Sequence, residues 1–235
     1  ICYEGAIDRL VEYLDQHPDV GIVGPKLLNT DGTLQESCRH FMKTWRLILQ
    51  HGFPWKKVFP RFAERISLAY WDHSYTRSVD WILGAALMIR RECLDQVGLK
   101  DESYFIFHED SDWCFQSWKA NWKVVFVHDA QIIHHGSQTV QKLWGGKHNI
   151  EVYKAQHNFI RKNLGKSELL MHRAFLTILL YLRWSRLDFA HFTSRVGDSE
   201  YESGADFLLK GIHVQLHSPI VDRKPKLDVT LEKKS

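Results

Sequence analysis

The chain has 235 residues, of which 44% are hydrophobic and 25% charged, and its formal net charge is +3. This is the composition of an ordinary globular protein with a sizeable core. Basic residues are spread along the chain without forming one run, which does not favour nucleic-acid binding but leaves a phosphate-bearing or anionic-membrane partner open. The four cysteines show no CxxC spacing, which argues against a zinc knuckle or a disulfide scaffold and fits a reducing, cytoplasmic setting.

The beginning of the chain has the pattern of a helix packed on a sheet. Residues 5–16, "GAIDRLVEYLDQ", place apolar side chains at i, i+3, i+4 and i+7, which predicts a helix with one buried face. Residues 21–23 predict a short buried strand, which a Gly-Pro step ends before a second extended piece. The pair Asp31-Gly32 is typical of a hairpin turn.

The next part of the chain is less regular. Residues 36–78 mix apolar and basic residues with several steps that join Pro to an aromatic residue, which suits a mobile excursion from the sheet with one helix near residues 42–51. The segment "SVDWILGAALMIRRECLDQVG" then predicts a buried strand that ends at Arg90 and a helix that Gly98 stops.

Two adjacent carboxylates mark the start of a further helix. The apolar run "SYFIFHED" gives way to "EDSDWCFQSWKAN", which has a helical pattern, so Glu109 and Asp110 are expected at a helix N-terminus. Carboxylates at that place commonly cap free backbone NH groups and complement the helix dipole. Taken alone, the pair favours this structural role over a catalytic one.

Two adjacent histidines follow a strand. Asn121 is expected to end the helix in a left-handed conformation, "KVVFVH" predicts one buried strand and "AQIIHHG" another, with His134 at its end. A lone histidine there is more often a hydrogen-bonded rim residue than a metal ligand. A carboxylate at a helix start and an imidazole at a nearby strand end can nevertheless converge at the carboxyl edge of an α/β sheet, where ligands bind.

Three segments carry a resemblance to a known family: "YLDQHPDVGIVGPKLLNTDGTLQESCR", "VDWILGAALMIRRECLDQVGLKDESYFIFHEDSDWCFQSWKANWKVVFVHDAQIIHHGSQT" and "HNFIRKNLG". In order and spacing they resemble the inverting glycosyltransferases of the second sequence family, particularly the rhamnosyltransferase-like members that build bacterial surface polysaccharides. The resemblance covers roughly residues 5–165. It implies an α/β fold, namely the C-terminal part of a GT-A (Rossmann-like) mixed sheet flanked by helices, with a helical C-terminal appendage.

The resemblance also implies the roles of individual residues. Asp110 would be the general base that removes a proton from the acceptor hydroxyl, with Glu109 beside it, and His134 would help to hold a Mg²⁺ or Mn²⁺ ion. Trp81 and Gly84 in the motif "WILGA", and Asp80 directly before it, would contact the substrate. The implied partners are a nucleotide-sugar donor and a glycan or lipid-linked acceptor, and nucleic acid is not among them.

These residue types suit that reaction. Displacement of a nucleoside diphosphate with inversion needs a base on the face opposite the leaving group, and a carboxylate about 3 Å from the acceptor oxygen can serve. A divalent cation, held by oxygen ligands and an imidazole, would balance the charge of the departing diphosphate. The chain has Asn121 where the family usually has Gly and His128 where it often has Pro, and both are acceptable in a turn or at a strand end.

The start of the chain differs from the family pattern. In the family, a βα nucleotide-binding unit ending in an Asp-x-Asp metal motif precedes the segment that "ICYEGAIDRL" resembles, and the chain begins at Ile1 without a methionine or a signal peptide. We therefore expect the acceptor-side part of a glycosyltransferase, which does not transfer sugar by itself. The alternative is a noncatalytic remnant or glycan-binding module that keeps the fold without turnover.

The segment at 169–184, "LLMHRAFLTILLYLRW", is the most apolar of the chain. Its apolar core is too short, and too interrupted by charged residues and His172, for a bilayer span of about 20 residues. It has two interpretations, a helix packed on the catalytic domain or an interfacial helix that holds Arg173, Arg183 and Arg186 near lipid phosphates. The second would place the chain peripherally at the inner face of the cell membrane.

The expected organisation therefore has three parts. Residues 1–165 form the acceptor-side part of a glycosyltransferase domain that carries the catalytic base, residues 166–221 a helical appendage, and residues 222–235 a charged, solvated tail.

Overall fold

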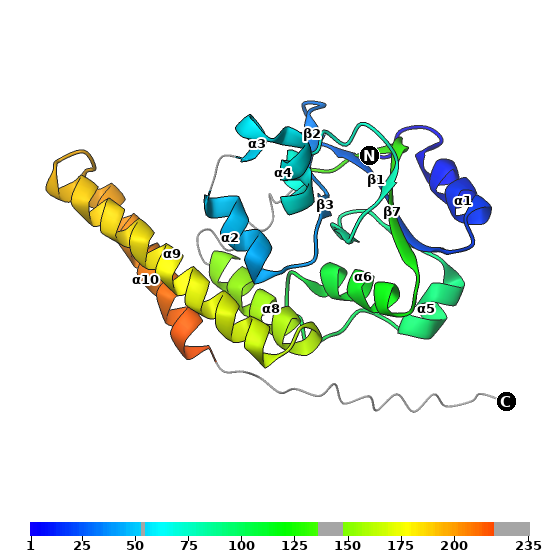
Figure 1. The fold of residues 1–235 in the computed structure, drawn as a ribbon. Coiled ribbons are helices and arrows are strands. Elements are labelled where there is room, and N and C mark those ends of the chain that lie inside the picture. Colours follow the sequence, from blue (N-terminus) through cyan, green and yellow to red (C-terminus); the bar gives the residue numbers. More distant parts are fainter. Residues whose placement is uncertain (53–54, 136–147, 219–235) are drawn as a thin grey trace.

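The computed structural model describes residues 1–52, 55–135 and 148–218 of the chain. In these residues a curled mixed sheet is flanked by helices, and helices α8 to α10 follow it (Figure 1). The expected α/β class, with a helical C-terminal part, is confirmed. The tail at 222–235 lies outside the described residues.

The first helix matches the prediction, whereas the first strand is longer and more continuous than the sequence indicated. Helix α1, Ala6–Gln16, confirms the predicted helix and buries Leu10 and Leu14. Strand β1, Val20–Leu28, runs through the Gly-Pro step, so the predicted break is wrong. The ladder to the neighbouring strand accommodates Pro25, which lacks an N–H, through a register shift between Pro25 and Lys26.

The sheet is built around one parallel pair. Strand β1 pairs in parallel with β7, Lys123–Ile133, and the strand order is β2-β1-β7-β4, with β6 also on β1. The antiparallel members are β2 (Leu34–Gln35), β4 (Arg77–Ser78) and β6 (Met88–Ile89). A separate antiparallel pair joins β3 (Cys38–Arg39) to β5 (Trp81–Ile82). The predicted turn at Asp31-Gly32 is confirmed, with Gly32 at φ 81° between β1 and β2.

The two strands expected at 123–135 are one strand. Strand β7 continues through residues 128–130. These three residues have no partners on β1, since Pro25 pairs with Val127 and the next residue, Lys26, pairs with Gln131. The backbone NH of His128 donates to Thr76 Oγ1 at 3.0 Å, so this amide is paired although it lies off the ladder. His134 follows the strand directly, as predicted.

The single strand predicted to end at Arg90 is wrong. The segment instead forms the short strands β4, β5 and β6, because the backbone between β5 and β6 turns aside to meet helix α6, Glu109–Lys119. The predicted helix is present as α5, Arg91–Val97, and Gly98 follows it at φ 76°. Asn121 is left-handed as expected, at φ 66°.

The core lies on both faces of the β1–β7 pair. Ile22 and Phe126 point to the face that α6 and α8 cover, together with Phe159. The residues next along each strand, including Val23 and Val125, point to the face that α1 covers. Both central strands are therefore buried, which explains their nearly continuous apolar sequence.

Residues 36–78 contain more helix than predicted. The helix expected at 42–51 is confirmed as α2, Thr44–Gly52, and it is followed by two further helices and a 3₁₀ turn that the sequence pattern did not indicate. These are α3 (Trp55–Val58), α4 (Pro60–Ile66) and Leu68–Tyr70.

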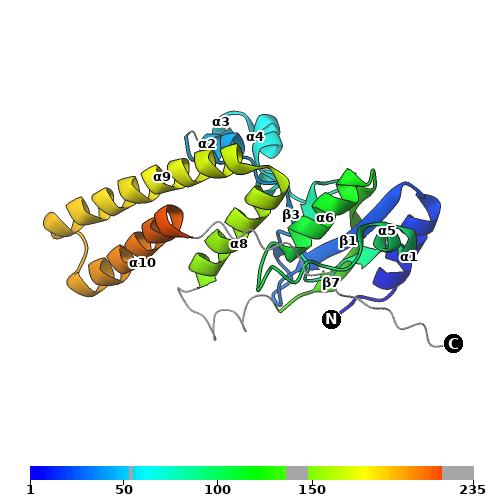
Figure 2. The same cartoon turned by 90° about the horizontal axis from the view of Figure 1, so that it is seen from below.

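The last helices pack against one another beside the sheet. Helix α8, His148–Asn163, leads to α9, Lys166–Phe192, which forms a long hairpin with α10, Asp198–His217 (Figure 2). The guanidinium of Arg173 donates to the carbonyl oxygens of Gln215 and Ser218, so it joins α9 to the end of α10, as the interpretation of a packed helix expects. No helix within the described residues has the length and hydropathy needed to cross a bilayer.

Candidate active site

The carboxylate of Asp110 is held at the start of α6 under an exposed turn. The residue is only 5% exposed. One carboxylate oxygen, Oδ2, accepts the backbone NH of Gly84 at 2.7 Å, and Oδ1 accepts the backbone NH of Ser111 at 2.7 Å. Gly84 itself is exposed. The carboxylate therefore lies directly beneath the surface, fixed by two backbone amides.

Burial raises the pKa of Asp110 above its ordinary value, and the charge of Glu109 adds to this shift, while the two amide hydrogen bonds and the Lys100 ammonium oppose it. A carboxylate with a raised pKa is a stronger proton acceptor than a solvated one. The environment of Asp110 is thus suited to a general base.

The turn above Asp110 requires glycine for close approach. A Cβ built on Gly84 would lie 3.2 Å from Asp110 Cβ, 3.3 Å from Asp110 Oδ2 and 3.2 Å from Lys100 Nζ. These distances are shorter than most Cβ contacts, so a side chain would push the turn away from the carboxylate. The absence of a side chain at Gly84 thus allows the turn to cover the Asp110 carboxylate.

Glu109 and His108 begin the same helix turn. Glu109 is half-buried, and its Oε2 has no hydrogen-bond partner in the part of the chain that the structure describes. His108 is left-handed, at φ 63°, and its Nδ1 lies 2.9 Å from Ser111 Oγ. Burial lowers the pKa of His108 to about 4, so the imidazole is neutral at physiological pH.

Asp80 shapes the neighbouring wall of the site. Its Oδ2 accepts the backbone NH of Phe41 at 2.7 Å and lies 3.2 Å from both His40 Nδ1 and Arg46 NH1. Burial alone would raise the pKa of Asp80, and the hydrogen bonds from His40 and Phe41 hold it below its usual value. Trp81 Nε1 donates to the carbonyl of His40 at 3.0 Å. Both predicted residues thus fix the segment that leads into α2.

A cavity of about 320 Å³ lies between this segment and the start of α6. Trp81, His108 and Ser111 line one side of it. The basic residues Arg39, His40, Lys43 and Arg46 also line it, together with apolar residues that include Met42 and Leu47. Sequence reasoning missed these basic residues, because the irregular excursion at 36–78 gave no periodic signal to place them.

Asp112 is the third carboxylate in the first turn of α6, and it was not predicted. The residue is 2% exposed, and its carboxylate accepts Asn163 Nδ2 at 2.6 Å and Lys162 Nζ at 2.7 Å. These bonds tie α6 to the end of α8. The repeated acid in "HEDSD" was the available signal for it.

His134 lies at a different corner, at the end of β7. Its Nδ1 is 2.7 Å from Oε1 of Gln35, whose Nε2 donates to Asn29 Oδ1 at 3.1 Å. The bond to Asn29 orients the Gln35 amide with its oxygen toward the imidazole, which favours a proton on Nδ1 and a lone pair on Nε2. Within the described residues, the hydrogen bonds of His134 go to Gln35 and Leu28 and to none of the residues around Asp110, so the structure does not join the two predicted corners by a direct hydrogen bond.

His134 has the surroundings of a metal ligand, since ligating imidazoles usually hydrogen-bond a neighbouring oxygen through the other ring nitrogen. Residue 1 lies beside it, because the Ile1 amine donates to the carbonyl of Ile133 at 2.8 Å. Within residues 1–52, 55–135 and 148–218, however, no group of three or more His, Cys, Asp or Glu side chains could hold a metal ion. The described residues thus offer His134 as a single candidate ligand and contain no complete metal site.

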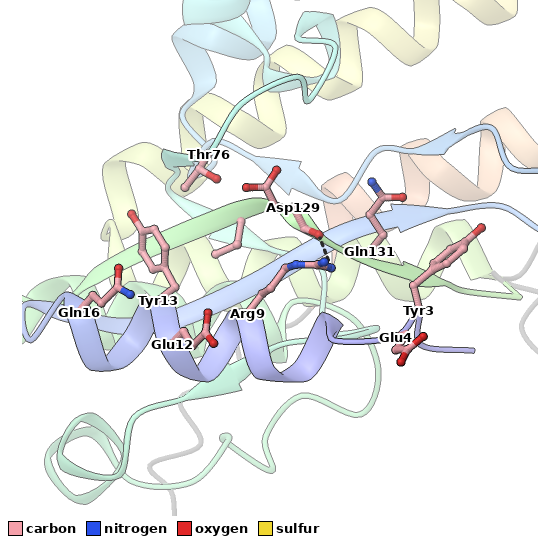
Figure 3. A pocket seen from close by; sticks show the side chains of 10 residues that line it. Tyr3, Glu4, Arg9, Glu12, Tyr13, Gln16, Thr76, Asp129 and Gln131 are labelled. Carbon is pink, nitrogen blue, oxygen red and sulfur yellow. Dashed lines mark hydrogen bonds between the residues drawn. The ribbon is translucent and has the colours of Figure 1, made fainter.

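A larger cavity, of about 820 Å³, lies elsewhere, over α1 and β7 (Figure 3). Tyr13 and Arg9 project into it from α1, and Arg9 donates to the carbonyl of Asp129 at 3.2 Å. None of the predicted site residues lines this open cavity. Of the predicted site residues, Trp81 lines the smaller cavity, and Asp110 lies next to it through His108 and Ser111 without being one of its lining residues.

The chain is similar to the N-acetylglucosaminyl-diphospho-decaprenol L-rhamnosyltransferases of two Mycobacterium tuberculosis strains, CDC 1551 / Oshkosh and ATCC 25618 / H37Rv. It is 31% identical to each over 138 residues, which are 56% of this chain and 42% of the relatives. The chain therefore spans less than half the length of these curated relatives. No family model matches the chain, and no solved structure matches it.

Proposed function

We propose that the chain is an enzyme, the acceptor-side part of an inverting GT-A glycosyltransferase that carries the catalytic base. It would transfer a sugar of the rhamnose class from a nucleotide donor to a lipid-linked or glycan acceptor in the synthesis of a bacterial surface polysaccharide. The similarity to two rhamnosyltransferases is the observation that carries this proposal. Residues 1–165 hold the site, and residues 166–221 form the appendage.

In this proposal Asp110 is the general base. The acceptor hydroxyl would give its proton to the Asp110 carboxylate while its oxygen attacks the anomeric carbon, and the nucleoside diphosphate would leave from the opposite face, which inverts the configuration. The raised pKa of Asp110 supports this role, because it increases the affinity of the carboxylate for that proton. The Gly84 amide would hold the carboxylate in place during the transfer.

The cavity beside Asp110 is our candidate for the acceptor site. Trp81 offers a ring against which a sugar can pack. Arg39, Lys43 and Arg46 line the same cavity, and their charges suit a diphosphate of the kind named in the relatives' acceptor. Asp80 would act by holding Phe41 and Arg46 in place, and not by touching the sugar.

His134 would provide one ligand to Mg²⁺ or Mn²⁺ through Nε2. The ion supplies positive charge to the departing diphosphate when it is bound. Gln35 and Asn29 would keep the Nε2 lone pair of His134 available.

The function can be tested with the native protein that contains this chain. We expect transfer of rhamnose from a nucleotide-rhamnose donor to N-acetylglucosaminyl-diphospho-lipid, detected by mass spectrometry, with an inverted anomeric configuration determined by NMR. A panel of other nucleotide sugars gives the donor specificity. Binding of the acceptor without any release of nucleoside diphosphate from any donor would favour a noncatalytic glycan-binding module instead.

The metal role can be tested by comparing two neighbouring histidines. We expect His134→Ala to weaken Mn²⁺ binding, measured by electron paramagnetic resonance, by about tenfold. His135→Ala should have little effect, because adjacent residues leaving a strand point in opposite directions. Equal losses from both variants, or a loss from His135→Ala alone, would show that His134 is not the ligand.

A further inference from the structure

Exposed apolar side chains occur on helices α2 to α4 and on α9. On α2 to α4 and the residue between α3 and α4 they are Trp45, Ile48, Val58, Phe59 and Phe62, and on α9 they include Met171, Ile178 and Leu182. Each of these eight side chains is between 43% and 59% exposed. Single exposed apolar residues need no explanation, but a contiguous group marks an interaction surface.

Helix α2 is in contact with α9, and α4 is in contact with α2 and α3. Glu168 Oε1 of α9 accepts the backbone NH of Thr44, the first residue of α2, at 2.6 Å. The rings of His51 and Phe175 also meet, with centroids 6.3 Å apart. Figure 2 shows α2 beside the first half of α9, with α10 on the other side of α9.

The apolar residues of α9 lie on the side of the helix that faces α2. Met171 is four residues before Phe175, and Ile178 and Leu182 are three and seven residues after it, so all share the face of the Phe175 ring. The opposite side of α9 packs on α10 and buries Leu176 and Leu180. We call the surface formed by α2 to α4 and residues 166–186 of α9 the α2–α9 face.

The exposed charges of the α2–α9 face are positive. Residues 43–66 contain six Lys or Arg residues and a single acid, Glu64, which is half-buried and paired with Arg77 at 3.7 Å. On α9, Glu168 is also half-buried and is bonded to α2. The exposed basic side chains of the face include Lys43, Lys57, Arg65, Arg183 and Arg186.

We propose that the α2–α9 face docks on an anionic lipid surface. Aromatic and aliphatic side chains ringed by Lys and Arg are the combination that binds the headgroup region of such a surface. A second copy of the chain fits less well, because a twofold interface on this face would bring positive charge onto positive charge. An acidic protein would match the charges, but it would not account for the spread of apolar groups over four helices.

The α2–α9 face adjoins the cavity beside Asp110. Lys43, Arg46 and Leu47 of the α2 region line the cavity, and Trp45 and Ile48 of the same helix lie on the face. A lipid-linked acceptor anchored at the docked surface would therefore meet the cavity from this side. This step of the inference rests on the proposed function, whereas the docking itself does not.

Vesicle flotation of the native protein tests the docking. The probes are vesicles of pure phosphatidylcholine and vesicles that contain about 30% phosphatidylglycerol, and we expect binding at least about tenfold stronger to the anionic ones, weakening as salt is raised. Arg183→Glu/Arg186→Glu and Ile178→Ser/Leu182→Ser should each reduce binding about tenfold or more. The matched control Leu209→Ser/Lys210→Glu, on exposed residues of α10, should bind as the wild type does.

The same variants separate the outcomes. Transfer to a water-soluble, short-chain acceptor should be unchanged in Ile178→Ser/Leu182→Ser, so loss of docking and loss of catalysis are distinguishable. Equal binding to both vesicle types, or none to either, would overturn the proposal. A dimer in light scattering that Ile178→Ser/Leu182→Ser dissociates, without vesicle binding, would assign the face to a second copy.

Discussion

Two regions of the molecule bury ionisable groups, and the regions differ in the hydrogen-bond partners that these groups have. At the start of α6, Asp110 is buried but accepts two backbone NH groups beneath an exposed turn. Between α8, α9 and α10, His157 and His172 are buried with Gln215, and neither ring nitrogen of His172 has a hydrogen-bond partner among the described residues. A group near the surface with fixed partners can react with a substrate, whereas the inter-helix layer contributes to packing.

The two regions also respond to pH with opposite signs. The pKa of Asp110 is raised by burial, so its contribution to stability is present at low pH and is lost as pH rises through that pKa. Burial lowers the pKa of both His157 and His172 to about 4, below the ordinary value of 6.5. The contribution of these neutral imidazoles to the free energy of unfolding is present above pH 6.5 and is lost as the pH falls from 6.5 toward 4.

The largest expected effect on stability comes from Asp112, which shares the first turn of α6 with Asp110 but bonds to side chains of α8. Asp112→Ala removes one partner from Asn163 and one from Lys162, which keeps its bond to Asp101, and we expect a loss of about 2 kcal/mol in the free energy of unfolding, measured by urea denaturation. The exposed pair Arg91–Asp95 gives the control, since Asp95→Ala should cost less than about 0.5 kcal/mol. Equal losses from the two variants would show that the bonds of Asp112 to α8 stabilise the fold no more than an exposed ion pair does.

Gly84→Ala tests the closing of the turn over Asp110. The added methyl would move the turn away from the carboxylate, and we expect kcat/KM for sugar transfer to fall about tenfold with little change in stability. Ala85→Ser, at the exposed neighbouring position, should transfer sugar at the wild-type rate. Wild-type kinetics in Gly84→Ala would mean that the amide of residue 84 does not position the base.

The smallest effect is expected from His172→Leu, which probes the inter-helix layer. Leu removes two buried nitrogen atoms that have no partner in the described structure, so we expect a gain of about 1 kcal/mol at neutral pH. The loss of stability between pH 6.5 and about 4 should also become shallower, because one proton-binding group of the unfolded chain is gone. The exposed His213→Leu is the control and should leave this pH dependence unchanged. A pH dependence in His172→Leu equal to that of the wild type would show that His172 does not titrate on unfolding.

The sequence predicted those parts of the fold in which periodicity and local turn chemistry agree. Helix α1, the turn at Gly32 and the end of α5 at Gly98 are all present, but the predicted apolar stripe of α1 is only half buried, since Ile7 and Val11 are exposed. The strand predicted before Arg90 failed because the Gly84 amide bonds to Asp110, a contact between residues 26 positions apart. Local propensity contains no information on such a contact.

The candidate site was predictable to a similar extent. The pair Glu109-Asp110 and His134 could be located at a helix start and at a strand end. The basic residues of the cavity could not be located, because Asp80 brings Arg46 and His40 together through bonds that span 34 and 40 residues. The pairing of Gln35 with His134 likewise depends on two strands that β1 joins.

The role of Asp110 as the base is tested most directly by kcat/KM for rhamnose transfer in Asp110→Asn. We predict a fall of about 10² or more, with the free energy of unfolding at neutral pH changed by less than about 1 kcal/mol, since relief of a buried charge offsets one lost NH contact. Asp129→Asn, on an exposed carboxylate at the bulge of β7, should retain wild-type kcat/KM. Near-wild-type kcat/KM in a folded Asp110→Asn would contradict the account.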